Sequence, residues 1–218
     1  NYLHMIRKAR SRAGVGSVPI LSRTVRGLEE GARLHVTPSM LHRAVNGALL
    51  GDLLMLVYHQ TLPYQKEPGA AEALLARWRQ QLGRRLQGGI LLHGERKALF
   101  AQIARSFSEI PRCQRQVQRI GIVGELYVKY CGMGNCGLVP YLHARNCEVY
   151  VNGLSWYALY YLDTHMVQDA AWGRACKPLL WYLNRVQTEL VDAVRQAGFQ
   201  CLDPYDRFCR TRQELIPY

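Results

Sequence analysis

The chain contains no Cys-x-x-Cys pair, although its 218 residues include seven cysteines. The two closest cysteines, Cys131 and Cys136, have four residues between them. Zinc ribbons and zinc fingers need tighter pairs to close a tetrahedral site, so this spacing argues against a self-contained zinc site. An odd number of widely spaced cysteines without a secretory signal also argues against a disulfide framework. We therefore expect free thiols.

The sequence also lacks an uninterrupted apolar run of membrane-spanning length. Its most apolar stretch, residues 40–58, contains His42, Arg43, Asn46 and Asp52. These polar groups would be costly at membrane depth, so the stretch predicts a buried helix of a cytoplasmic protein with no membrane partner. No signal peptide is visible, and the chain opens with Asn1 rather than Met, which suggests a piece of a larger protein.

Acidic residues are few. There are 16 of them against 28 lysines and arginines, which gives a formal net charge of +12. Clustered basic residues neutralise nucleic-acid phosphates, but here they are spread along the chain and no aromatic-interleaved binding motif accompanies them. We expect most of them on solvated faces. An anionic ligand such as CoA, a partner surface and a nucleic acid remain the less favoured alternatives.

The first half of the chain has the apolar spacing of helices. Thr37 is suited to cap a helix and Pro38 to occupy its first position, and Gly88 with Gly89 ends a later helix. The expected elements are helices over residues 2–13, 37–59, 69–86 and 95–108, with one short buried strand over residues 18–22.

The pattern changes after Arg119. An apolar run over residues 120–123 precedes a glycine-rich loop, a helix over 138–145 and a second strand over 147–151. Strand, loop, helix and strand at this spacing predict a βαβ unit with parallel strands. Two further helices are expected, one capped by Ser155 and one over residues 174–196 that ends at Gly198. The fold class is therefore α/β, with a parallel sheet flanked by helices and a mostly helical N-terminal half.

The loop over residues 132–137 satisfies the pattern Gly-x-Gly-x-x-Gly and precedes a helix. Two features argue against a dinucleotide site. The first glycine falls eight residues after Gly124 instead of at the strand end, and the next strand ends in Asn152 where an acidic ribose ligand is expected. The simpler interpretation is a flexible loop at the carboxyl end of a parallel strand.

That position matters because open α/β sheets bind ligands beyond the carboxyl ends of their strands. Glu125 follows the first strand directly and is the candidate catalytic residue. A carboxylate there could act as a general base, or it could accept hydrogen bonds from the N-terminus of the following helix; both alternatives stay open. The other candidate residues of the crevice are Lys129, Tyr130, Cys131 and Asn135.

The run over residues 119–130 resembles a signature stretch of the large activase and dehydratase proteins of the 2-hydroxyglutaryl-CoA dehydratase family. Further stretches are similar in the same order along nearly the whole chain. They are Asn1-Tyr2-Leu3, Arg7-Lys8-Ala9, Val18-Pro19-Ile20, Gly27-Leu28-Glu29, Gly51-Asp52-Leu53-Leu54-Met55, Pro63-Tyr64 with Pro68-Gly69, Glu148-Val149 and Ala197-Gly198-Phe199.

The resemblance implies two Rossmann-like domains around an oxygen-sensitive 4Fe-4S or double-cubane cluster. Residues 1–113 would be the remnant of the first domain, and residues 114–218 a second domain that is incomplete at its C-terminus. It also implies an ATP-dependent activase, as a domain or a subunit, that delivers a low-potential electron to the cluster. In this family the electron reaches a CoA thioester and forms a ketyl radical.

The resemblance places the cluster cysteine before Asn1, so we expect no cofactor and no metal site within this chain, and no activity from the chain alone. The parent protein would be a lyase or reductase. The sequence departs from the family at residues 131–134, where relatives tend to carry an Asn-Pro-Phe-like stretch. A ligand role for Cys131 or Cys136 therefore stays open.

Overall fold

The computed structural model of the chain describes residues 2–16, 18, 37–168 and 170–203. Two compact units are formed by residues 1–41 and 42–218. The predicted domain boundary near residue 113 falls inside the second unit, and whether it separates two folding domains stays a prediction. In the first unit, helix α1 (Tyr2–Arg12) confirms the helix expected over residues 2–13. Beyond Val18, the strand expected over residues 18–22 lies outside the described residues.

Helix α2 (Pro38–Thr61) begins where the sequence predicts it. The hydroxyl oxygen of Thr37 accepts a hydrogen bond from the backbone N–H of Met40 at 3.1 Å, which confirms the predicted cap. The one-turn helix η1 (Leu62–Tyr64) follows directly. Residues 38–64 are long and apolar enough to cross a membrane, but 44% of the most apolar window is buried inside the structure. A core helix passes the same test of length and composition.

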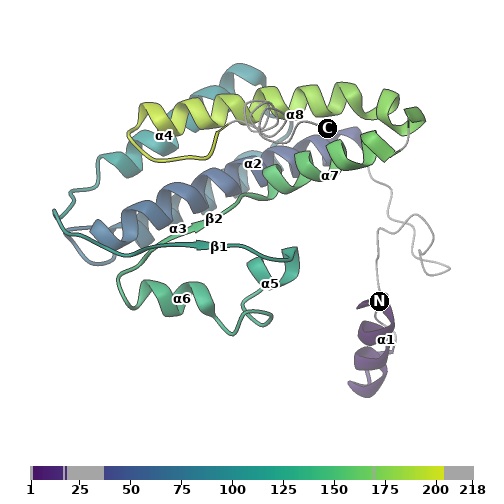
Figure 1. The fold of residues 1–218 in the computed structure, drawn as a ribbon, viewed down its shortest axis with the longest axis horizontal. Coiled ribbons are helices and arrows are strands. Elements are labelled where there is room, and N and C mark those ends of the chain that lie inside the picture. The colour runs from purple at the N-terminus through teal and green to yellow at the C-terminus, as the bar shows by residue number, and fades with distance from the viewer. Residues whose placement is uncertain (1, 17, 19–36, 169, 204–218) are drawn as a thin grey trace, which may run out of the picture. The chain divides into compact units, whose positions relative to one another are not determined.

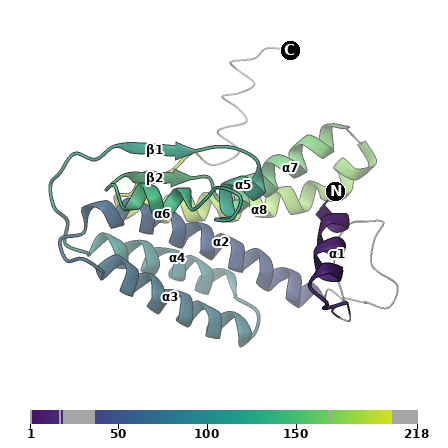
Figure 2. The same cartoon turned by 90° about the horizontal axis from the view of Figure 1, so that it is seen from below.

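Four helices of the second unit share one hydrophobic core, and Figure 2 shows three of them, α2, α3 and α4, side by side. They are α2, α3 (Ala70–Gln87), α4 (His93–Ser108) and α8 (Ala170–Gln196). Leu53, Phe100, Phe107 and Leu190 are completely buried in this core. Helix α8 packs against both α4 and α7 (Leu154–Gln168). The all-helical middle section expected from the sequence is confirmed.

The two described strands lie between α2 and α6 (Leu138–His143), as Figure 1 shows. Strand β1 (Arg119–Ile122) pairs with β2 (Glu148–Val151) in parallel, with Ile120 opposite Val149. Met55 of α2 and Leu142 of α6 pack against the strands in a second, smaller core. The predicted parallel pairing is therefore confirmed, and the described chain is mostly helical with a small parallel sheet.

One helix between the strands was given no bounds by the sequence. Helix α5 (Leu126–Tyr130) follows β1, where the sequence predicts a glycine-rich loop and indicates a helix only as one that Glu125 could cap. It has five residues, too few to show a helical period of apolar side chains. Its cap residue, described below, is what defines it.

Helix α8 ends as the sequence predicts. Gly198 has a φ of +83°, a conformation that a side chain disfavours. Its N–H donates to the carbonyl of Arg195 at 3.0 Å, and the N–H of Phe199 donates to the carbonyl of Val194 at 3.1 Å. These two bonds form a Schellman motif, which satisfies the last carbonyl groups of the helix.

Gly198 and Gly83 should respond to alanine in opposite directions. Gly198→Ala should lower the free energy of unfolding by about 1–2 kcal/mol, because alanine resists a positive φ. Gly83 lies inside α3, and a Cβ added there meets no atom within 4 Å. Gly83→Ala should therefore raise the free energy of unfolding by about 0.5–1 kcal/mol. Urea unfolding measures both. A stabilising Gly198→Ala would contradict the motif.

Candidate functional site at the carboxyl ends of the strands

Three segments converge at the carboxyl ends of the two strands. Helix α5 follows β1, helix α7 follows β2, and the middle of α2 passes the same edge. The segment from α2 brings Asp52, which is only 7% exposed. A candidate site at this edge was expected from the sequence, but the contribution from α2 was not.

The carboxylate of Asp52 binds the first turn of α7. Its Oδ1 accepts a hydrogen bond from the N–H of Leu154 and its Oδ2 one from the N–H of Ser155, both at 2.7 Å. A Cβ at Gly153 would lie 2.5 Å from the Asp52 carboxylate, so only glycine permits this close approach. The start of α7 is thus capped by a residue of another helix.

The prediction that Ser155 caps this helix is wrong. Ser155 is the second residue of α7 and is buried, and its N–H is one of the two donors that Asp52 accepts. Leu154 and Ser155 need an outside acceptor because the first N–H groups of a helix have no partner within it.

Asp52 shares this edge with an amine and a phenol. Burial raises the pKa of Asp52 above its usual range, while the nearby Ser155 hydroxyl, the two backbone N–H groups and the ammonium of Lys129 oppose the shift. Burial lowers the pKa of Lys129, and Asp52 opposes that shift in turn. Burial and the Asp52 charge both raise the pKa of Tyr130, whose hydroxyl donates to the carbonyl of Asn152.

Glu125 is exposed and caps its own helix. Its Oε2 accepts hydrogen bonds from the N–H groups of Tyr127 at 2.8 Å and Val128 at 3.3 Å. The sequence left open whether Glu125 is a general base or a hydrogen-bond acceptor for the helix N-terminus. In the structure it is the hydrogen-bond acceptor. These bonds do not test a catalytic role for Glu125, which stays a prediction.

Asn135 ties the two short helices together. Its Oδ1 accepts from the N–H groups of Gly137 at 3.1 Å and Leu138 at 3.2 Å, at the start of α6. Its Nδ2 donates to the carbonyl of Lys129, in α5, at 3.4 Å. The side chain expected to be a polar contact for a ligand is therefore engaged with the backbone on both sides of the loop.

Cys131 lies in the loop between these helices and is partly exposed. The N–H of Gly134, the Tyr127 side chain and the N–H of Met133 lower the pKa of its thiol, in that order of importance. Cys136 is exposed and has a φ of +54°. Within the described ranges no three His, Cys, Asp or Glu side chains are placed to hold a metal ion.

The predicted residues therefore fall into two groups, those near Asp52 and those that bind nearby backbone. Lys129 and Tyr130 lie within electrostatic reach of Asp52, whereas the polar groups of Glu125 and Asn135 bind nearby backbone. The residue that sequence reasoning missed is Asp52. The available signal was a carboxylate in the middle of an apolar helix, because such a group is rarely buried without a partner.

A second buried polar pair joins α2 to α6. Nδ1 of His59 lies 3.0 Å from Nε2 of His143, and the two rings pack with their centroids 4.8 Å apart. Burial, with a smaller contribution from His143, lowers the pKa of His59 from 6.5 to about 3. Burial also lowers the pKa of His143. Both imidazoles are consequently neutral at physiological pH.

Comparison of the chain with protein-family models, with curated proteins and with solved structures finds no match. The class of protein to which this site belongs is therefore proposed below. That proposal is supported by the sequence resemblance and by the chemistry of the described residues.

Removing the Asp52 carboxylate should destabilise the protein. Asp52→Ala leaves the N–H donors of Leu154 and the buried Ser155 without an acceptor, so the free energy of unfolding should fall by about 2–3 kcal/mol. The control is Asp192→Ala, because Asp192 is an exposed residue of α8 and its loss should cost less than about 0.5 kcal/mol. Urea unfolding compares the two variants. An equal loss of free energy of unfolding in the two variants would show that the hydrogen bonds of Asp52 do not stabilise the protein.

The histidine pair should make the protein sensitive to acid. Because the folded-state pKa of His59 is about 3, below the unfolded value of 6.5, the unfolded chain binds more protons between these pH values. Stability should therefore fall as the pH drops from about 6.5 toward 3, by up to about 1.4 kcal/mol per pH unit from this group. His59→Gln should flatten that dependence in urea unfolding, whereas the exposed control His4→Gln should leave it unchanged. An unaltered slope in His59→Gln would contradict the assignment.

Proposed function

We propose that this chain is part of a 2-hydroxyacyl-CoA dehydratase-type iron–sulfur protein that works with an ATP-dependent activase in low-potential electron transfer to a CoA thioester or a similar substrate. The observation that carries the proposal is the resemblance of residues 119–130, together with the similar stretches in the same order along the chain. That run coincides with β1 and α5. Its second half therefore stands where α/β sheets commonly bind ligands.

The described residues do not fit the iron–sulfur cluster itself. No three ligating side chains converge in the part of the chain that the structure describes, and the five cysteines whose side chains are described are free thiols. In this proposal the ligands of the cluster belong to other parts of the parent protein. No step of the reaction is therefore assigned to the cluster here.

The strand ends supply a setting for an anionic substrate group. Lys129 is half-buried, so its ammonium is screened less by water than an exposed lysine. This ammonium interacts with the Asp52 carboxylate. It can also stabilise negative charge that develops on a substrate carbonyl. Glu125 stands at the start of α5, four residues before Lys129, and is the candidate proton acceptor or orienting residue.

The same proposal covers the wider setting of the protein. It expects β1 and β2 to belong to a Rossmann-like parallel sheet and the parent enzyme to be a cytoplasmic lyase or reductase. The activase would be its partner, either as a fused domain or as a subunit. A membrane partner is not part of the proposal.

A non-catalytic scaffold within such a protein is the second candidate. The specific observation in its favour is that Glu125 and Asn135 both use their polar atoms to cap backbone at the proposed site. A scaffold needs this loop for its shape alone. The two candidates therefore differ in what a change at Glu125 does to turnover.

Glu125→Gln separates them in the intact parent protein, purified without oxygen and supplied with activase, ATP and a low-potential reductant. Glutamine keeps an acceptor oxygen for the N–H of Tyr127, so the melting temperature should be nearly unchanged. Thioester-dependent turnover should fall about tenfold or more if Glu125 moves or orients a proton. The control is Glu109→Gln, since Glu109 is exposed and pairs with Arg105 four residues earlier.

The other outcomes are equally informative. Unaltered turnover in Glu125→Gln would remove this loop from the mechanism and favour the scaffold. A parallel loss of stability and turnover would assign Glu125 to structure. A parent protein that shows no activase-dependent turnover of any CoA thioester would sink the proposed function.

A further inference from the structure

A cavity of about 450 Å³ lies where the segment before α4 meets α8 and His42 of α2. We call it the Arg96 pocket, and its main lining residues are Ile90, Leu92, Arg96, Trp181, Tyr182 and Arg185. Its volume is that of a small-molecule site. None of these residues belongs to the strand-end site.

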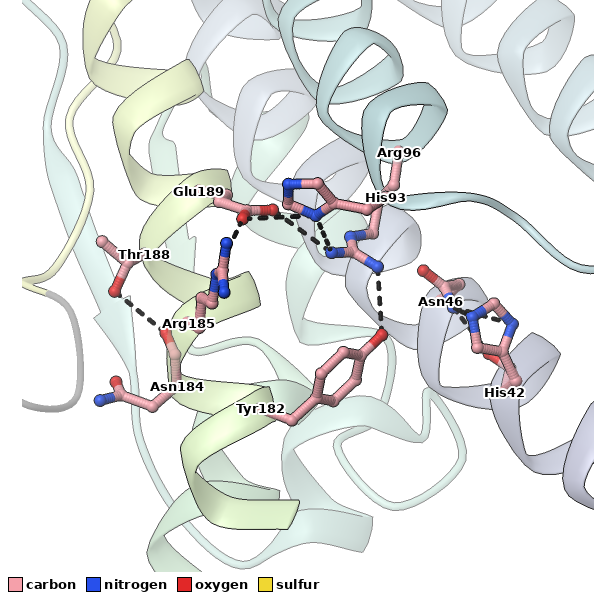
Figure 3. A network of polar contacts seen from close by, with 9 residues as sticks. All are labelled: His42, Asn46, His93, Arg96, Tyr182, Asn184, Arg185, Thr188 and Glu189. Carbon is pink, nitrogen blue, oxygen red and sulfur yellow. Dashed lines mark hydrogen bonds and ion pairs between the residues drawn. The ribbon is translucent and has the colours of Figure 1, made fainter. Parts of the chain in front are cut away.

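The base of the pocket holds a buried guanidinium. Arg96 is only 2% exposed, and Figure 3 shows it between His93 and Tyr182. Its Nη1 donates to the hydroxyl of Tyr182 at 3.1 Å, and its Nη2 lies 3.0 Å from Nδ1 of His93. Its Nε is buried and has no hydrogen-bond partner within the described chain. A buried charge with an unused donor is costly unless something satisfies it.

Protein carboxylates only partly balance this charge. Glu189 is shared, with an oxygen 3.3 Å from Nη2 of Arg96 and another 3.7 Å from Nε of Arg185. His93 lies 3.6 Å from the same carboxylate. Two guanidinium groups, which stay charged at neutral pH, therefore face one carboxylate. The pocket has an excess of positive charge even with its histidines neutral.

The mouth of the pocket is apolar. Trp181 is 63% exposed and Leu92 70% exposed, although both are large hydrophobic side chains. The guanidinium of Arg185 lies 5.7 Å from the centre of the Trp181 ring, which places a charge beside a flat apolar surface. A ligand body that covers these side chains would remove apolar area from water.

We propose that the Arg96 pocket binds a small organic anion, a carboxylate carried on a flat or aliphatic body. The carboxylate offsets the excess charge of Arg96 and Arg185. The body lies against Trp181 and Leu92. Bidentate recognition of a carboxylate is the task to which the planar guanidinium is best suited. This inference is independent of the proposed function, because it needs neither the cluster nor the strand-end residues.

The test uses the 218-residue chain in reducing buffer, with phenylacetate and hexanoate as probes and isothermal titration calorimetry as the readout. At least one of the two should bind saturably with one site per chain. Phenylacetamide has the shape of phenylacetate without its charge, and acetate has the charge without the body. Each should bind about tenfold more weakly than the better probe, because each lacks one of the two interactions.

Two variants at exposed residues test binding without disturbing the fold. Arg185→Gln and Trp181→Ala should each weaken binding, by about tenfold for the lost charge, with the melting temperature nearly unchanged. Arg79→Gln on α3 removes an exposed arginine away from the pocket and should bind like the unmodified chain. Absence of saturable binding by both probes would overturn the proposal. So would equal binding of the neutral analogue, or equal weakening by Arg79→Gln and Arg185→Gln.

Discussion

The hydrogen bonds between the Asp52 carboxylate and the first turn of α7 are the constraint on which the rest of the second unit depends. They join the central helix of the hydrophobic core to the segment that leaves β2. An anion at a helix N-terminus accepts otherwise unpaired N–H groups and interacts favourably with the helix dipole. Gly153 lets the end of β2 and the start of α7 approach this carboxylate closely, because a Cβ there would lie 2.5 Å from it.

That arrangement also explains the electrostatics of the strand ends. Desolvation penalises the ionised carboxylate, and the Ser155 hydroxyl, the two capping N–H groups and Lys129 oppose it. Lys129 is held near Asp52 by α5, whose start is set by Glu125 and whose end is tied to α6 by Asn135. Side chains that cap the short helices therefore place the charged groups of the candidate site. A structural role for Glu125 and Asn135 and a functional role for the edge are compatible for this reason.

Much of the fold could be predicted from local sequence. The helices over α2, α3 and α4 have apolar spacing and clear end signals, and Thr37 and Gly198 mark ends that the structure confirms. The parallel pairing of β1 with β2 follows from the order of strand, helix and strand. Helix α5 could not be given bounds from the sequence because one capping carboxylate, rather than apolar periodicity, defines it.

The polar contacts that build the sites are the part that local sequence could not supply. The partners of Asp52 lie 102 and 103 residues further along the chain, and Glu189 lies 93 residues beyond Arg96. Nothing near either residue in sequence shows which distant group satisfies it. Ser155 was expected to cap α7 because local pattern cannot reveal that a residue from another helix already does so.

Amide hydrogen exchange at Leu154 and Ser155 tests the central constraint most directly, because it reports on the two donors themselves. First-turn amides without an acceptor exchange rapidly, whereas amides held by a buried carboxylate exchange only when the surrounding structure opens. If the Asp52 carboxylate holds the first turn of α7, both amides are protected nearly as well as the core amides of α2, such as that of Leu53. Exchange as fast as that of exposed loop amides would contradict it.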